Sequence, residues 1–88
     1  MFRLRWEERA MGELAEFWLQ SDSQRRAAIT AATSQIEALL LDDPVGWSEP
    51  HADGRRIIFV PPLGVTFRVE EDGEVVSVLG AWLFLEHN

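Results

Sequence analysis

The sequence contains no cysteine, so neither a disulfide nor a zinc site with thiolate ligands can form within this chain. It also lacks any apolar run approaching the roughly 20 residues that a membrane-spanning helix needs. The longest apolar stretches are IIFVPPLGV and VLGAWLFL, and the first ten residues carry too many charges for a signal peptide. These absences predict a soluble, cytoplasmic protein that does not associate with membranes.

The chain has neither lysine nor tyrosine, and all eight of its basic residues are arginine. Fifteen acidic residues give a formal net charge of −7, which repels a phosphate-rich partner at long range. Arginine can bind carboxylates and phosphates through two parallel hydrogen bonds, but a GC-rich genome produces the same bias toward arginine. The overall charge therefore argues against a general affinity for nucleic acid.

With 88 residues, 47% of them hydrophobic and four of them tryptophan, the chain has the composition of one globular domain, residues 1–88. Residues 2–6 alternate between apolar and arginine side chains, which is typical of a half-buried strand. Apolar residues then recur every three or four positions, which predicts a helix over 7–20 and a second over 23–41, with Ser21 or Asp22 as the N-cap.

Residues 42–54 hold two prolines and two glycines and are predicted to form a loop. Strands are expected over 55–60, 65–70 and 74–82, with Gly73 in the last hairpin turn. The order β-α-α-β-β-β predicts an α+β fold of two layers, in which an antiparallel helix pair packs on one face of an antiparallel sheet. Alternation places Arg3, Arg5 and Arg68 on the other, open face.

The aromatic residues divide into three groups. Trp6, Phe17 and Trp18 fall at strand and helix spacing and are expected in the core. Trp47 is expected to fold its loop onto the core. The apolar segment from Trp82 through Phe84 to Leu85 either closes the core or offers a patch for a partner.

From residue 1 to about residue 84, the sequence resembles the RelE/ParE family of bacterial type II toxins in the order, length and spacing of its elements. The segment FRLRWEERAMGELAEFW resembles the opening strand and helix of that family. The segment GRRIIFVPPLGVTFRVEEDGEVVSVLGAW resembles its closing three strands, in the variant with a proline-containing turn. The resemblance implies a toxin that a cognate antitoxin neutralises by binding to it.

Within this family, RelE-like members cut messenger RNA on the ribosome, and ParE-like members poison DNA gyrase without nuclease chemistry. Arg55 and Arg56 match the basic residues at the start of the family's second strand. The arginine expected at the start of the third strand is replaced by Gly64 or Val65. At the end of the fourth strand and in the tail, the chain offers only His87.

Cleavage of RNA by its 2′-hydroxyl needs a base, an acid and cations. The cations here would be Arg55, Arg56 and Arg68, and the candidate bases are His51, His87 and Glu49. Successive side chains of a strand alternate, so at most one of Arg55 and Arg56 can lie on the open face. Taken singly, each arginine is interpreted as a solvated strand end that faces Glu70 or Glu74 across the sheet.

The pair His51 and Asp53 provides too few ligands for a metal site, and we expect neither a metal ion nor a cofactor. The sequence favours a non-nucleolytic toxin, directed at gyrase or another target, over a ribosome-dependent messenger RNA endoribonuclease. An inactive relative that serves as an interaction module, including as a homodimer, is a third hypothesis. The residues predicted to contact the antitoxin are Arg3, Arg5, Arg68, Trp82 and Phe84.

Overall fold

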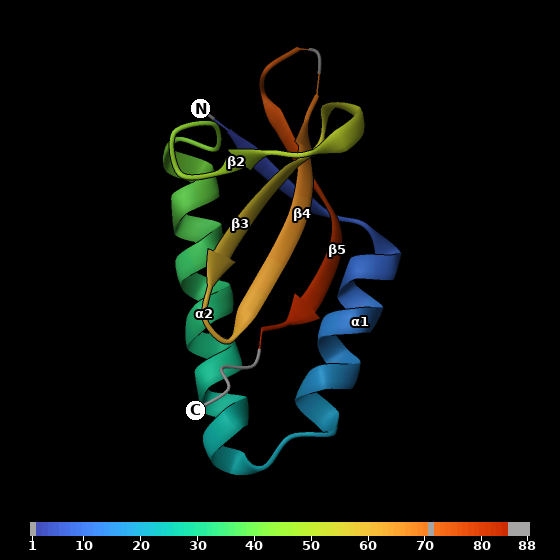
Figure 1. The fold of residues 1–88 in the computed structure, drawn as a ribbon, viewed down its shortest axis with the longest axis vertical. Helices are drawn as coiled ribbons and strands as arrows, with labels where there is room; N and C mark the ends of the chain where they lie inside the picture. Colours follow the sequence, from blue (N-terminus) through green and yellow to red (C-terminus); the bar gives the residue numbers. More distant parts are fainter. Residues whose placement is uncertain (1, 71, 85–88) are drawn as a thin grey trace.

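A computed structural model describes residues 2–70 and 72–84. The elements in chain order are β1 (Arg3–Trp6), α1 (Glu8–Leu19), α2 (Ser23–Asp42), β2 (Glu49–Pro50), a single 3₁₀ turn η1 (Ala52–Gly54), β3 (Arg56–Val60), β4 (Leu63–Val69) and β5 (Val75–Leu83). Both helices pack against one sheet (Figure 1), so the predicted α+β class is confirmed. None of the helices in the described residues is long and apolar enough to cross a membrane.

The five strands form one sheet in the order β1-β5-β4-β3-β2. Strands β3, β4 and β5 pair antiparallel as expected, and β2, which lies within the predicted loop of residues 42–54, adds a two-residue antiparallel strand beside β3. Strand β1 instead lies parallel to β5, with Arg3 opposite Val75 and Trp6 opposite Val78. The sheet is therefore mixed, and in this one pair it differs from the antiparallel sheet that the sequence predicts. Alternation of side chains fixes which face a strand buries, but not the direction of a neighbour that is distant in sequence.

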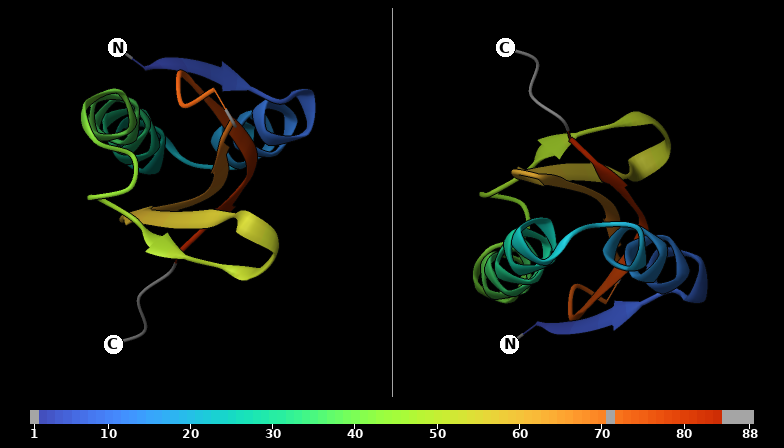
Figure 2. Two further views of the ribbon diagram at one scale, coloured as in Figure 1. Left: turned by 90° about the horizontal axis from the view of Figure 1, so that it is seen from above. Right: turned by 90° about the horizontal axis from the view of Figure 1, so that it is seen from below.

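The core lies on the inner face of the curved sheet, where α2 packs (Figure 2). Val65 and Phe67 of β4 point inward, and both are fully buried. Leu4 and Trp6 of β1 also pack against the core, and Arg3 and Arg5 point to the opposite face. Three residues of α2, Ala32, Ile36 and Leu40, complete this cluster.

Helix α1 runs beside β5 beyond the end of β1. The backbone N–H of Glu7 donates to the carbonyl of Val78 at 2.9 Å, which is the last main-chain bond to β5 on this side before the helix begins. Further along, the Glu13 carboxylate accepts a hydrogen bond from the backbone N–H of Ala81 at 3.1 Å. A side chain of α1 therefore satisfies a donor on β5 where the neighbouring strand has ended.

Helix α2 begins at the residue that the sequence predicts. The Asp22 carboxylate accepts a hydrogen bond from the Arg25 backbone N–H at 2.8 Å, which satisfies one of the free donors of the first turn.

Replacing Asp22 with alanine is expected to lower the free energy of unfolding by about 1 kcal/mol, because the cap is lost and the chain gains no compensating contact. Chemical denaturation followed by circular dichroism would measure the change. The control is Ser23→Ala at the first helical position, which leaves the cap in place. An equal loss in both variants would contradict the capping role.

Two tryptophans lie outside the core, contrary to prediction. Trp18 is 39% exposed on the flank of α1, with its indole N–H donating to Thr30 Oγ1 at 3.3 Å. Trp47 is 54% exposed and donates to Asp42 Oδ2 at 3.1 Å. In both cases the ring stays near the surface with a polar partner for its N–H, which amphipathic tryptophan permits.

Candidate partner-binding site

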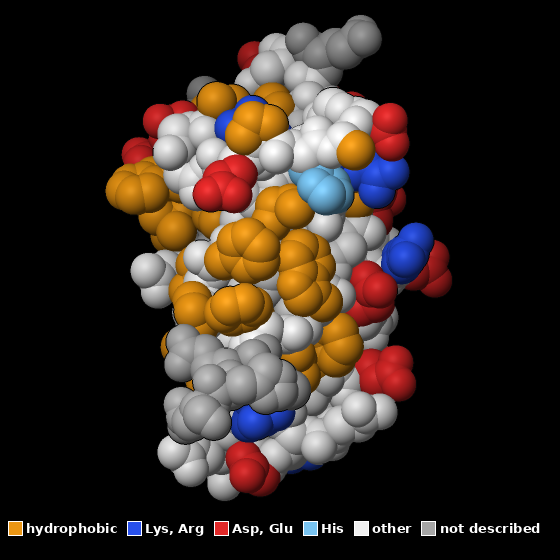
Figure 3. Space-filling view, in the orientation of Figure 1, with side chains coloured by type: hydrophobic (Ala, Val, Ile, Leu, Met, Phe, Trp, Pro, Cys, Tyr) orange, Lys and Arg blue, Asp and Glu red, His pale blue; other side chains and the backbone are white. Residues whose placement is uncertain are grey.

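The outer face of β3, β4 and β5 carries an exposed group of aromatic side chains. The ring of Phe59 meets that of Trp82 edge-on, with centroids 5.8 Å apart, and meets that of Phe84 at the same separation. We call Phe59, Trp82 and Phe84 the aromatic cluster. Phe59 is 45% exposed and Phe84 is 42% exposed, and Figure 3 shows apolar side chains gathered at the centre of this face. Contiguous exposed apolar surface of this kind marks an interaction site.

The Trp82 ring can lie close to the backbone of Gly64 because this residue has no side chain. Gly64 is the partner of Phe59 in β3 and of Trp82 in β5. A Cβ atom at this position would lie 2.5 Å from Cε2 of the Trp82 ring. The glycine therefore creates the space in which the aromatic cluster assembles.

Replacing Gly64 with alanine is expected to destabilise the fold by about 1–3 kcal/mol and to change the tryptophan fluorescence, because the ring of Trp82 must move. The matched control is Gly12→Ala on α1, where a Cβ would meet nothing within 4 Å. That change is expected to stabilise the protein by up to about 1 kcal/mol, because it removes a glycine from a helix interior. If the free energy of unfolding changed in the same direction in both variants, the close-packing explanation would be refuted. Both stabilities come from urea denaturation.

Beside Trp82 lies a hollow of about 220 Å³ that two arginines help to line. Arg9 reaches it from α1 and Arg55 from the residue before β3, and Glu13 and Thr66 also line it. Glu13 lies 3.8 Å from Arg9, and Asp53 lies 3.8 Å from Arg55. Each arginine thus has a carboxylate within ion-pair distance, and Arg9 keeps a largely exposed side chain.

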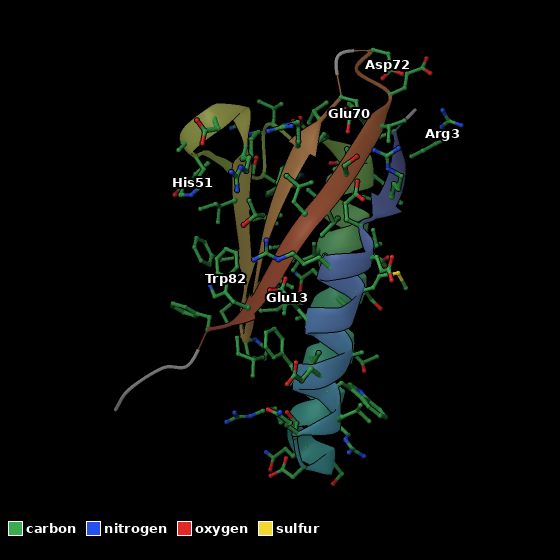
Figure 4. All side chains as sticks on the ribbon, turned by 90° about the vertical axis from the view of Figure 1, so that its right-hand side faces the viewer. Arg3, Glu13, His51, Glu70, Asp72 and Trp82 are labelled. Carbon is green, nitrogen blue, oxygen red and sulfur yellow. The ribbon has the colours of Figure 1, made fainter. Side chains whose placement is uncertain are left out.

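Three predicted contact residues, Arg3, Arg5 and Arg68, lie on the outer face as alternation predicts, but at the other end of the sheet from the aromatic cluster. Figure 4 shows Arg3 near Glu70 and Asp72 there, well away from Trp82. Arg5 donates to Ser77 Oγ at 2.9 Å and lies 3.3 Å from Glu70. This is one of the cross-strand pairs with acidic residues that the sequence predicts.

The open face is smaller than predicted, because the segment with β2 and η1 lies against the end of β4. Arg68 donates to the carbonyl of Asp53 at 3.2 Å and is thereby tied to this segment. Arg56 points to the inner side, where it donates to Ser48 Oγ at 2.7 Å and to the carbonyl of Val45 at 3.2 Å. Of the two consecutive arginines, only Arg55 therefore reaches the outer face, as the alternation predicts.

The candidate bases are not brought together. His51 is exposed, and Figure 4 shows it on the same side of the sheet as Trp82, but it does not line the hollow beside that residue. Glu49 is exposed on β2, and His87 lies outside the described residues. Among residues 2–70 and 72–84, no three histidine, aspartate or glutamate side chains gather as a metal ion would require.

Sequence reasoning missed Phe59, Arg9 and the role of Gly64. The signal for Phe59 was present, since the alternation that points Ile58 inward points Phe59 outward. Arg9 carries no such signal, because its place beside β5 depends on how α1 packs along the sheet.

Comparison with known proteins finds similar solved structures. No protein-family model and no curated protein matches the sequence. Among solved structures, a chain of the P. aeruginosa chromosomal ParDE system is 20% identical with a TM-score of 0.77, over 97% of this chain and 98% of that chain. A chain of the Mycobacterium tuberculosis RelBE2 toxin–antitoxin complex is 14% identical with a TM-score of 0.74, over 93% and 96%.

A chain of the intact E. coli RelBE toxin–antitoxin complex is 18% identical with a TM-score of 0.65, over 99% of this chain and 100% of that chain. At such identities the likeness establishes the fold. This is the fold that the resemblance to the RelE/ParE family implies, so the resemblance is confirmed at the level of the fold.

Proposed function

We propose that this chain is the toxin of a type II toxin–antitoxin pair and that its antitoxin binds the outer face of β3, β4 and β5. The observation that carries the site is the aromatic cluster, which holds three large rings on the outer face of the sheet, with Phe59 and Phe84 nearly half exposed. The fold of this chain is shared with chains of RelBE and ParDE complexes, which supports a partner of the antitoxin type. Buried aromatic anchors supply most of the binding energy in many protein interfaces.

We further propose that the toxin acts without cleaving RNA. Positioned acids and bases each contribute about 10²–10⁴-fold to such reactions. Among the described residues that line the hollow beside Trp82 there is no histidine, and the carboxylate of Glu13 already accepts the Ala81 N–H. A protein target is then favoured, and DNA gyrase is the target that resemblance to ParE implies.

The convergence of Arg9 and Arg55 on one hollow favours a second candidate, the messenger RNA endoribonuclease. Two guanidinium groups could stabilise a phosphate in the transition state. Arg9 would then supply, from α1, a cation in place of the family's arginine where this chain has Gly64 or Val65.

Expression of this chain alone is expected to arrest bacterial growth, and co-expression of the protein encoded beside its gene is expected to restore it. Transcript ends mapped during the arrest should match those of uninduced cells. Arrest with new, specific transcript ends would replace the first mechanism with the second. Unaffected growth, with soluble folded protein in the cells, would contradict the toxin proposal and favour the inactive module.

A further inference from the structure

The hollow beside Trp82 brings two cationic side chains to the edge of the aromatic cluster. Arg9 lies in the first turn of α1 and Arg55 directly precedes β3, so the packing of α1 along β5 places both at one site. Figure 4 shows Glu13 of α1 and Trp82 of β5 at this end of the sheet. The volume of about 220 Å³ lies below the roughly 300 Å³ at which sites for whole small molecules begin, so the hollow suits one small polar group.

The guanidinium groups of Arg9 and Arg55 have donors to spare in the part of the chain that the structure describes. Arg5, Arg56 and Arg68 each donate at least one hydrogen bond to another segment of the chain. Arg9 and Arg55 instead lie beside one carboxylate each, at 3.8 Å, a separation too long for a hydrogen bond. A guanidinium offers several N–H donors, so both groups can bind an added acceptor without giving up a bond that stabilises the fold.

The charge of the hollow is opposite in sign to that of the whole chain. Among the described residues that line it, Arg9 and Arg55 are positive and Glu13 is negative, which leaves a positive excess where the chain as a whole carries −7. Charges more than about 8 Å away are largely screened at physiological salt, so this local excess attracts an anion. A nucleic-acid strand extends beyond the hollow and brings further negative charges close to the acidic residues, whereas a carboxylate on a protein adds a single charge. The hollow therefore favours a carboxylate.

We propose that the hollow binds one carboxylate of the antitoxin, held by Arg9 and Arg55, while an apolar side chain of the same segment packs on the aromatic cluster. The inference rests on the proposed function, since it assigns part of the antitoxin site. A carboxylate accepts two parallel hydrogen bonds from one guanidinium, and two guanidinium groups can satisfy both of its oxygens. Leu79 and Trp82 also line the hollow, and apolar walls strengthen such bonds once a partner covers the site. The hollow thus selects an antitoxin with an acidic residue, or its own chain end, beside an apolar anchor.

The test measures how tightly single arginine variants bind the purified antitoxin, the protein encoded beside the gene of this chain. Arg9→Gln and Arg55→Gln are each expected to weaken binding by about 10- to 100-fold, because each removes one of the two groups that hold the carboxylate. Arg9→Lys and Arg55→Lys keep the charge but lose the paired donors, so smaller losses are expected. The matched control is Arg25→Gln, the same loss of charge at an exposed position of α2 outside the hollow, with a change of at most about two-fold. Urea denaturation of each variant separates loss of the contact from loss of the fold.

Variants of the antitoxin identify the source of the carboxylate. Each of its aspartates and glutamates is replaced in turn with asparagine or glutamine, and in a separate variant its chain end is amidated. One of these changes is expected to weaken binding to the wild-type chain by about ten-fold or more, and to have little effect on a chain that carries both Arg9→Gln and Arg55→Gln. Coupling of this kind marks a direct contact.

The outcomes separate this inference from the proposed function. A stable complex in which Arg9→Gln, Arg55→Gln and Arg25→Gln have equal effects would overturn the inference and leave the proposed function standing. So would the absence of any antitoxin carboxylate coupled to the arginines. A partner that does not bind the wild-type chain would overturn both. A short single-stranded RNA that binds the wild-type chain, loses affinity for Arg9→Gln and is displaced by the antitoxin would assign the hollow to phosphate groups instead.

Discussion

Replacing Phe67 with alanine is expected to lower the free energy of unfolding by about 3–5 kcal/mol, the usual cost of a buried phenylalanine. Phe67 is fully buried at the centre of β4, in contact with the cluster that joins α2 to the sheet. A domain of this size has a total stability of roughly 5–15 kcal/mol, so the variant should be unfolded in a measurable fraction at 37 °C. Urea denaturation at 25 °C measures the difference.

The matched control is Phe59→Ala, the same chemical change on the neighbouring strand and on the opposite face of the sheet. Phe59 is half exposed and makes edge contacts with Trp82 and Phe84, so a loss near 1 kcal/mol is expected. Comparable losses in the two variants would mean that the two faces of the sheet are buried to a similar extent, contrary to the fold described above.

Replacing Trp82 with alanine is expected to weaken binding of the antitoxin by about 30- to 1,000-fold, or 2–4 kcal/mol. Trp82 is the centre of the aromatic cluster, since Phe59 packs against its ring and the ring lies over Gly64. Removing the ring deletes the anchor and leaves the remaining rings without support. Isothermal titration calorimetry with the purified partner gives the dissociation constant.

Trp47→Ala is the control, because Trp47 is also exposed and its indole N–H is also bonded within the chain, to Asp42. It lies in the loop after α2 and not in the aromatic cluster, so its loss should leave the affinity unchanged within about two-fold. Urea denaturation of both variants separates loss of the contact from loss of the fold. Equal weakening by the two changes would remove the aromatic cluster as the specific anchor.

Much of the fold could be predicted because local chemistry determines it. Alternation in residues 2–6 predicted which side of β1 is buried, and Asp22, one of the two residues predicted as the N-cap, caps α2. Gly73 has a φ of +73° in the turn before β5, where the sequence places a glycine for that reason. These features depend on neighbours within a few residues.

The direction of β1 could not be predicted, because the strand that it joins is more than 65 residues away in the sequence. The exposed position of Trp18 could not be predicted either, because its helical spacing is equally compatible with the core and with the flank that faces α2. Residues 42–54 were expected to form a loop, but they contain the short strand β2 and the turn η1, and their contact with Arg68 depends on how the chain returns across β4.

Only part of the candidate site could be predicted, because the rest depends on contacts between segments that are distant in the sequence. Trp82 and Phe84 were identified because they belong to an apolar segment at the end of the last strand, and the sequence left open whether they close the core or form a patch. The structure places them in an exposed group with Phe59. Arg3, Arg5 and Arg68 share the outer face but lie toward the opposite end of β5, so one partner would have to span the sheet to contact all five residues.

The central claim is that a partner covers the outer face of β3 to β5, and hydroxyl-radical footprinting of the chain with and without its antitoxin tests it most directly. Oxidation is read at each aromatic side chain, so Phe59 and Trp82 report on the outer face and Trp47 serves as an internal reference. We predict that the partner lowers the oxidation of Phe59 and Trp82 several-fold and leaves Trp47 unchanged. Unchanged oxidation of Phe59 and Trp82 in a stable complex would contradict the account.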